Sequence, residues 1–154
     1  MVDRLTPAER SAHMARIKRA NTKPELVVRR LLHRLGYRFR TQFKNAPGRP
    51  DIAFPGRRKA IYIHGCFWHA HEGCSVSRVP KTHTDFWRAK FDRNRERDRR
   101  LEKAARDAGW DCLTIWECEV GDETKLANQL RKCLGPPKRQ LLPENRRHTF
   151  VSCR

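Results

Sequence analysis

A short segment over 64–74 constrains this chain more than any other part of its sequence. It reads HGCFWHAHEGC and holds three imidazoles and two thiols within eleven residues. Nitrogen and sulfur donors at this spacing suit a tetrahedral zinc ion. Two close cysteines supply only part of a closed site, so a distant ligand is needed, and Cys118 at the end of a predicted strand is the best candidate. The predicted ligands are Cys66, His71, Cys74 and Cys118, and the alternative is a few buried thiols beside surface histidines.

The net charge of the chain indicates the class of partner. Lys and Arg number 35 against 17 Asp and Glu in 154 residues, which gives a formal charge of +18. Such an excess favours a polyanion, most simply nucleic acid. An anionic membrane is a weaker alternative, because neither a basic amphipathic anchor nor a run of about 18 apolar residues is present. The first ten residues, MVDRLTPAER, lack an apolar signal region, so we expect a cytoplasmic protein with reduced thiols.

The order of local patterns predicts an α/β fold. Capping-box signatures at Thr6–Glu9 and Thr22–Glu25 start two helices, and Gly36, Gly109 and Gly135 are stop signals. Periodicity predicts helices over 22–35, 84–108 and 125–134, and strands over 37–43, 51–54, 60–63 and 112–116. Three strands, a crossover helix and a returning strand make one mixed central sheet flanked by helices. We expect a basic helical arm over 1–22, one compact domain over 23–134 and a basic, flexible tail over 135–154.

A carboxylate opens one of the predicted apolar strands, at Asp51 in the sequence GRPDIAF. Such a group is costly to bury unless it binds a cation or hydrogen-bond donors. As a hard oxygen ligand it suits Mg²⁺, whereas the alternative is an Asp that caps the turn after Pro50. A hairpin of the strands over 51–54 and 60–63 would bring Asp51 and His64 to one edge of the sheet.

Two pairs of adjacent aromatic residues flank this region, Phe67–Trp68 and Phe86–Trp87. They are either wedges that enter a base stack or a small core that covers the metal site. The predicted helix behind the second pair carries nine basic and four acidic residues over 88–106, among them Arg88 and Arg93. This excess favours contact with phosphates over a merely solvated face.

Several motifs together resemble the very short patch repair (Vsr) endonucleases: HGCFWH at 64–69, FW at 86–87, ERD at 96–98, GW at 109–110 and WEC at 116–118. GRPD at 48–51 resembles the first catalytic strand of that family. The resemblance covers about residues 6–134 and implies a restriction-endonuclease-like (PD-(D/E)XK-type) fold with a structural zinc and an endonuclease domain over 23–134. It implies Mg²⁺-assisted nicking of one DNA strand 5′ to the thymine of a T·G mismatch, the product of 5-methylcytosine deamination.

The resemblance also implies residue roles by position. Asp51 would bind Mg²⁺, helped by the backbone carbonyl of Ile63, and His69 would be the general base. Three further side chains would support the metal and its water, namely His64, Asp98 and Glu25. The wedge beside the mismatch would consist of Phe67, Trp68 and Trp87.

The expected partner is duplex DNA with a mismatch, and mismatch-repair proteins and a DNA polymerase are further candidates. We expect a monomer in the bacterial cytoplasm, associated with the nucleoid, with no membrane contact. The metal loop departs from the family, because two residues separate His71 from Cys74 where the family spacing has one, and Gly73 can absorb the extra residue. Three alternatives stay open: a same-fold nickase with another mismatch or sequence preference, a zinc-stabilised DNA-binding module without catalysis, and a basic RNA-binding protein.

Overall fold

The computed structural model of the protein describes Thr6, Glu9 and residues 20–137. Its elements are α2 (Lys23–Arg34), β1 (Arg40–Thr41), β2 (Ile52–Phe54), the 3₁₀ helix η1 (Pro55–Arg57), β3 (Lys59–His64), α3 (Thr84–Asp107), β4 (Asp111–Trp116), the 3₁₀ helix η2 (Glu117–Glu119) and α4 (Glu123–Leu134). Most of the predicted arm over 1–22 and of the tail over 135–154 lies outside the described residues. At the arm's predicted start, Thr6 and Glu9 exchange the hydrogen bonds of the expected capping box.

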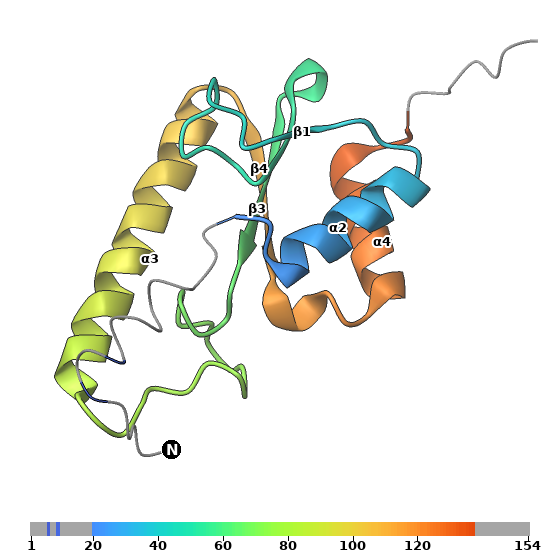
Figure 1. The fold of residues 1–154 in the computed structure, drawn as a ribbon. Coiled ribbons are helices and arrows are strands. Elements are labelled where there is room, and N and C mark those ends of the chain that lie inside the picture. Colours follow the sequence, from blue (N-terminus) through green and yellow to red (C-terminus); the bar gives the residue numbers. More distant parts are fainter. Residues whose placement is uncertain (1–5, 7–8, 10–19, 138–154) are drawn as a thin grey trace, which may run out of the picture.

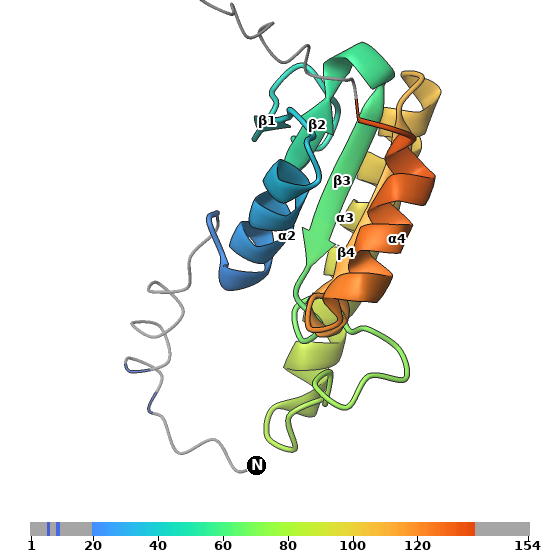
Figure 2. The same cartoon turned by 90° about the vertical axis from the view of Figure 1, so that its right-hand side faces the viewer.

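The strands form one mixed sheet in the order β1-β2-β3-β4. β1 and β3 both pair antiparallel with β2, whereas β4 runs parallel to β3 and follows it through α3. One face of the sheet is covered by α3, and the other by α2 and α4, as the two views show (Figure 1, Figure 2). The predicted mixed sheet with flanking helices is therefore confirmed.

The helices end at their predicted stop signals, and α2 begins at its predicted capping box. The helix predicted over 125–134 begins earlier, at Glu123, because the Asp122 side chain caps it by accepting a hydrogen bond from the Lys125 amide. Thr22 and Glu25 form the capping box at the start of α2. Gly36, Gly109 and Gly135 follow the ends of α2, α3 and α4 with φ angles of 82°, 78° and 70°, which a residue with a side chain rarely adopts. Among the described helices, none combines the length and the apolar character needed to cross a membrane.

The strand predicted over 37–43 is largely wrong, because β1 comprises Arg40–Thr41 alone. Tyr37 is buried, as the alternation of apolar residues requires. Gln42 then takes a left-handed φ of 48°, which ends the pairing with β2. As a result Phe43 packs in the apolar cluster under α3, whereas Tyr37 packs in the cluster under α2 and α4. Apolar periodicity does not reveal a left-handed residue inside an otherwise alternating pattern.

Two apolar clusters of different character fill the two sides of the sheet. The cluster under α2 and α4 is built from large side chains: Val28, Leu31, Leu32, Tyr37, Ile52, Phe54, Ile61, Ile115, Leu126, Ala127, Leu130 and Leu134. The buried cluster under α3 consists of Ala46, Ala53, Ala60, Ala105 and Trp110. The alanines let α3 approach the strands closely, and larger side chains there would push the helix away. This close approach brings polar groups of α3 within reach of the end of β3.

The turn between β2 and β3 fastens helices on both faces of the sheet. Arg57 donates hydrogen bonds to the carbonyls of Leu134 and Pro136 at the end of α4, the second at 2.7 Å. The next residue, Arg58, donates from Nη2 to the carbonyl of Ala108 at the end of α3, at 2.6 Å. Carbonyls at the end of a helix lack partners within their own helix. Two consecutive arginines therefore satisfy one helix end on each face.

We expect Arg57→Ala to lower the free energy of unfolding by about 1–2 kcal/mol, because it removes two charge-assisted hydrogen bonds to a helix end. Urea unfolding followed by circular dichroism measures the change, with the exposed Arg30→Ala as control. Because Arg58 serves the other face, the effects of Arg57→Ala and Arg58→Ala should add within about 0.5 kcal/mol. A coupling above about 1 kcal/mol between them would contradict two separate roles.

Candidate active site

A cleft of about 900 Å³ lies where β3 ends, between the start of α2 and the middle of α3. Its lining includes Glu25, Asp51, Ile63, His64, Trp68, His69 and Asp98. Four other predicted DNA-binding residues, Phe67, Trp87, Arg88 and Arg93, are not part of this lining. In the antiparallel β2–β3 hairpin Ile52 lies opposite Ile61. The residue before β2, Asp51, therefore lies beside the last residues of β3. The predicted meeting of Asp51 and His64 at one edge of the sheet is therefore observed.

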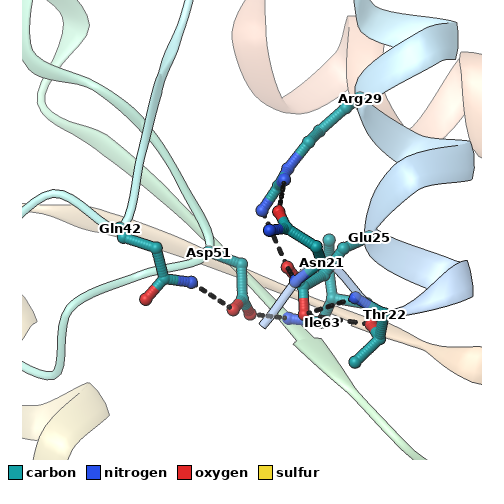
Figure 3. Close-up of polar contacts among 7 residues, drawn as sticks. All are labelled: Asn21, Thr22, Glu25, Arg29, Gln42, Asp51 and Ile63. Atoms are coloured by element: carbon teal, nitrogen blue, oxygen red, sulfur yellow. Dashed lines mark hydrogen bonds and ion pairs between the residues drawn. The ribbon is translucent and has the colours of Figure 1, made fainter. Parts of the chain in front are cut away.

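Asp51 is a partly buried carboxylate held by the sheet itself. Its Oδ2 accepts a hydrogen bond from the Ile63 amide at 2.8 Å, and the Gln42 side-chain nitrogen lies 3.5 Å from Oδ1 (Figure 3). Burial raises the pKa of Asp51 to about 6, against the opposing effect of the Ile63 amide, and the charge of Glu25 raises it further. The Ile63 carbonyl lies on the same side of β3 as its amide, since both groups of a strand residue face one neighbour. A carboxylate and a carbonyl so placed offer oxygen donors for a hard cation.

Glu25 lies close to Asp51 but is engaged by its own helix. Its Oε2 accepts from the Asn21 amide at 3.0 Å and from Arg29 Nη2 at 2.7 Å, and its Oε1 accepts from the Thr22 hydroxyl at 2.9 Å (Figure 3). The residue is 3% exposed. These contacts fix the carboxylate at the start of α2 and neutralise it with Arg29. Glu25 thus caps the start of α2, and its negative charge acts on Asp51 across the cleft.

The two histidines of the cleft form a parallel stack beside a carboxylate. The rings of His64 and His69 are 3.9 Å apart between centroids and 7° from parallel, and His69 Nδ1 is hydrogen-bonded to Asp98 Oδ2. Burial lowers the pKa of His64 to about 4, with a further contribution from His69. Burial acts to raise the pKa of Asp98, but the hydrogen bond and charge of His69, with smaller contributions from His64 and Arg97, together outweigh burial and hold that pKa below its usual value. When Nδ1–H faces the carboxylate, the other nitrogen of His69, Nε2, is free to accept a proton.

Ligand atoms of His64, His69 and Asp98 lie within 4.8 Å of one another, which is close enough for a metal ion. Two imidazoles that share a metal must point their lone pairs at one position, whereas the lone pairs of parallel stacked rings do not converge. In addition, Nδ1 of His69 is already occupied by Asp98. The arrangement therefore suits proton transfer better than metal binding.

The second cluster of ligand atoms contains the four predicted zinc ligands, Cys66, His71, Cys74 and Cys118, whose ligand atoms all lie within 4.8 Å of one another. His71 Nδ1 is 3.6 Å from Cys66 Sγ and 3.5 Å from Cys118 Sγ. Tetrahedral geometry with Zn–S and Zn–N bonds of about 2.3 and 2.0 Å places S and N ligands about 3.5 Å apart. The donor set and its spacing therefore fit zinc. Gly73 has a φ of 70°, so the extra residue of the loop is accommodated as predicted.

A row of aromatic rings links this cluster to the cleft. The ring of His71, one of the predicted zinc ligands, stacks on Trp116 at 4.0 Å between centroids and 4° from parallel. Trp116 meets His64 edge to face at 5.3 Å, and His64 in turn stacks on His69. Because each ring touches the next, the position of His69 depends on packing that begins at the metal cluster.

The aromatic pairs form a third cluster, between the metal loop and the start of α3. Phe67 packs on Trp87 and Phe91 with centroid distances of 5.1 and 5.4 Å, and Trp68 lies 6.3 Å from Trp87. Trp87 is 9% exposed, whereas the adjacent Phe86 is 54% exposed. Trp87 thus supports Phe67 and Trp68 from below, and its ring must leave this cluster before it can enter a base stack.

The basic residues of α3 differ in whether they form an ion pair among the described residues. Five of them form ion pairs with acidic neighbours: Arg95, Arg97, Arg99, Lys103 and Arg106. Arg88 and Arg93 are exposed. Contact of these two residues with phosphates stays a prediction.

Sequence reasoning missed some of the groups that shape the cleft. Arg29 follows Glu25 by four residues, a spacing typical of helical ion pairs that could have identified it. Trp116 belongs to the recognised WEC motif, yet the motif gives no sign of its stacking partners. Nothing in the sequence marks Gln42, whose side chain reaches Asp51 through a left-handed backbone.

Comparison with known proteins assigns the chain to a family. A family model described as DNA mismatch endonuclease Vsr matches residues 2–75. The protein named type II nicking enzyme V.XorIIP, of Xanthomonas oryzae pv. oryzae, is 46% identical over 136 residues, which cover 88% of this chain and 99% of that relative. DNA mismatch endonuclease Vsr of Escherichia coli K12 is 40% identical over 129 residues, which cover 84% of this chain and 82% of that relative. The chain belongs to the Vsr family of DNA mismatch endonucleases.

Membership in the Vsr family identifies the protein as a nuclease, which hydrolyses phosphodiester bonds. The resemblance noted in the sequence is thus confirmed at the level of the family. The cleft that holds Asp51, His69 and Asp98 is the candidate for the site of hydrolysis in this Vsr endonuclease.

The raised pKa of Asp51 makes the stability of the folded protein depend on pH. The folded protein binds the Asp51 proton more tightly than the unfolded chain does, with a pKa of about 6 against about 3.9. Stability is therefore lost as the pH rises from about 4 to 6, and it stays reduced above that range. In magnesium-free buffer at pH 7.5, we expect Asp51→Asn to raise the free energy of unfolding by about 1–3 kcal/mol.

Urea unfolding at several pH values measures this gain, which should shrink towards pH 4.5. The buffer is passed over a chelating resin and contains no free chelator, so that a structural metal stays bound. Asp111→Asn, at the opposite end of the sheet from the cleft, is the matched control. A gain that is the same at pH 4.5 and 7.5 would show that burial of the Asp51 charge is not its cause.

Proposed function

We propose that the protein nicks one strand of duplex DNA 5′ to the thymine of a T·G mismatch, by Mg²⁺-assisted hydrolysis on a restriction-endonuclease-like fold. The observation that carries this proposal is that Asp51 and the His69–Asp98 pair line the same cleft. A hydrolytic site needs a cation ligand and a proton acceptor near one phosphate, and these residues are of the required kinds. Membership in the Vsr family supports the same substrate class.

Asp51 and the Ile63 carbonyl would hold Mg²⁺, and their oxygen donors fit such an ion. When bound, Mg²⁺ neutralises charge that builds on the phosphate during attack. Asp51 is suited to this task because it is partly buried and its charge has few hydrogen-bond partners, one of which is the Ile63 amide.

His69 is the proposed general base. With Nδ1–H directed at Asp98, its Nε2 accepts a proton from the attacking water, whose oxygen bonds to phosphorus as the leaving oxygen departs. Asp98 keeps the imidazole oriented and stabilises the imidazolium that forms. His64 stays neutral at neutral pH because its pKa is about 4, so it shields one face of the His69 ring without adding charge.

The aromatic cluster supports mismatch recognition. Trp68 both lines the cleft and packs with Phe67 over Trp87, which places flat rings next to the proposed site of hydrolysis. Mispaired bases unstack at a lower cost than paired ones, so rings that enter the stack select for a mismatch. Phe67 and Trp68 are the proposed wedge, with Trp87 beneath them.

The proposed occupant of the four-ligand cluster is zinc in a structural role. Three thiols and one imidazole leave no open position for a substrate in a tetrahedral shell, as is typical of structural sites. Burial raises the pKa of Cys66 to about 12, so a thiolate there requires a cation beside it. The site would hold together the irregular segment between β3 and α3, residues 65–83.

A second candidate is a nickase of the same fold with another mismatch or flanking-sequence preference. It is favoured by relatives whose names describe them as type II nicking enzymes. The test of the main proposal therefore uses several substrates side by side.

The substrates are labelled duplexes that carry T·G, each other mismatch or a matched pair in several sequence contexts. With Mg²⁺, we expect one nick 5′ to the mispaired thymine and little cutting of the other duplexes. Asp51→Ala should lower the cutting rate more than about 100-fold while the Kd for the T·G duplex changes less than about 5-fold. Gel mapping of the product and binding titrations at fixed salt measure these quantities.

Asp111→Ala serves as the control for removal of a carboxylate and should cut at the wild-type rate. Selective cutting of another mismatch would favour the second candidate. Mismatch binding without cutting by the wild-type protein would instead indicate a DNA-binding module, and equal affinity for structured RNA would indicate an RNA-binding protein. Unchanged cutting by Asp51→Ala would remove this residue from the mechanism.

For the metal cluster, we expect Cys118→Ser to reduce bound zinc well below one per chain and to destabilise the fold by more than about 2 kcal/mol. Atomic absorption and thermal unfolding measure the two effects. The matched control is Cys133→Ser, a thiol outside the cluster, which should keep its zinc. Full zinc content and an unchanged Tm in Cys118→Ser would contradict the assignment.

A further inference from the structure

The cleft is acidic inside a strongly basic protein. Its lining contains five carboxylates, from Glu25, Asp51, Asp98, Glu102 and Glu117. Among the described residues, the cations of the lining are Arg49 and Arg97. A DNA phosphate that enters this space meets negative charge, so these two arginines decide how it can be held.

Arg97 forms an ion pair with the Asp98 carboxylate. Its Nη2 lies 3.2 Å from Asp98 Oδ1, while the other oxygen of Asp98 holds His69. Its charge therefore serves the Asp98–His69 pair. Arg49 is exposed, and the contacts of the described residues give it no carboxylate partner. Arg49 is the cation of the cleft that a phosphate can use.

The backbone of Arg49 is held in an unfavourable conformation. Its φ is 47°, in the left-handed region that residues with a side chain seldom occupy. The following residue is Pro50, and proline disfavours this conformation at the position before it. No hydrogen bond or ion pair among the described residues explains why an arginine stands where a glycine would be free of strain.

The surrounding loop keeps Arg49 in place from both sides. A Cβ atom at Gly48 would lie 3.2 Å from Leu101 Cβ on α3, so the loop lies tightly against that helix. The Tyr62 hydroxyl donates to the carbonyl of Pro47 at 2.9 Å, and Pro50 is fully buried. The guanidinium is thus presented from a rigid support two residues before Asp51.

We propose that Arg49 binds the non-bridging oxygens of the DNA phosphate that is cut. This inference rests on the proposed nicking activity. A guanidinium offers two parallel N–H donors that match two phosphate oxygens, and such a contact strengthens as charge builds on the phosphate. Arg49 would then hold the phosphate from one side while Asp51 faces it from the other, with His69 free to act on the water.

Single-turnover cutting of a T·G duplex by the full chain, with enzyme in excess, tests this role. We expect Arg49→Gln to lower the rate constant about 100-fold, and Arg49→Lys to recover part of the loss because it keeps the charge without the planar fork. We expect Arg49→Gly to cut as slowly as Arg49→Gln but to keep its Tm at or above that of the wild type, since glycine is free of the strain. Arg131→Gln on α4, remote from the cleft, controls for the loss of one positive charge.

A fall in rate without a fall in Tm supports the phosphate contact, because a merely structural arginine would lower both. A rate within about 3-fold of the wild type in Arg49→Gln overturns the inference and leaves the nicking activity intact. A joint fall of rate and Tm in Arg49→Gly also overturns it. If the wild-type protein itself does not cut the T·G duplex, the proposed function fails, and that outcome is distinct from both.

Discussion

The hydrogen bond from the Ile63 amide to the Asp51 carboxylate is the contact on which the rest of the site depends. It exists because the β2–β3 hairpin has one register, with Ile52 opposite Ile61. The same hairpin carries Arg57 and Arg58 at its turn, which tie down the ends of α4 and α3. A slip of one residue would turn the buried side chains of β2 to the wrong face and separate the carboxylate from the end of β3. The packing of both faces and the geometry of the cleft therefore share one determinant.

Much of this arrangement could be predicted from the sequence, and what escaped prediction has a common physical reason. The capping box of α2 could be predicted because its hydrogen bonds join residues only three positions apart. The Cys/His cluster could be predicted because thiols and imidazoles at close spacing are typical ligands of zinc. The strand over 37–43 failed at Gln42, whose left-handed backbone leaves no trace in apolar periodicity. The division of the aromatic pairs into buried Trp87 and exposed Phe86 was equally invisible, since it depends on how the metal loop folds over α3. Motifs formed by residues close in the sequence can be predicted, whereas packing between segments far apart in the sequence cannot.

The net charge of the chain is strongly positive, whereas the charged residues that line the cleft are mainly acidic. The chain as a whole carries +18, which attracts DNA over long distances, yet the cleft is lined mainly by carboxylates. An acidic pocket on a basic surface draws cations inward while the surface draws the polyanion, so the two partners meet at the pocket. Burial of Asp51, with a smaller contribution from the charge of Glu25, raises its pKa to about 6, which reflects the cost of keeping a carboxylate charged in this pocket.

The row of rings from His71 through Trp116 and His64 to His69 has an evolutionary consequence. A substitution at position 116 disturbs both the predicted zinc-ligand cluster and the histidine pair, so a change in one affects the other. Lineages that alter one must find a compensating change in the other, and a flat side chain between them is the simplest solution. Trp116 is thus constrained from two directions, by His71 on one side and His64 on the other.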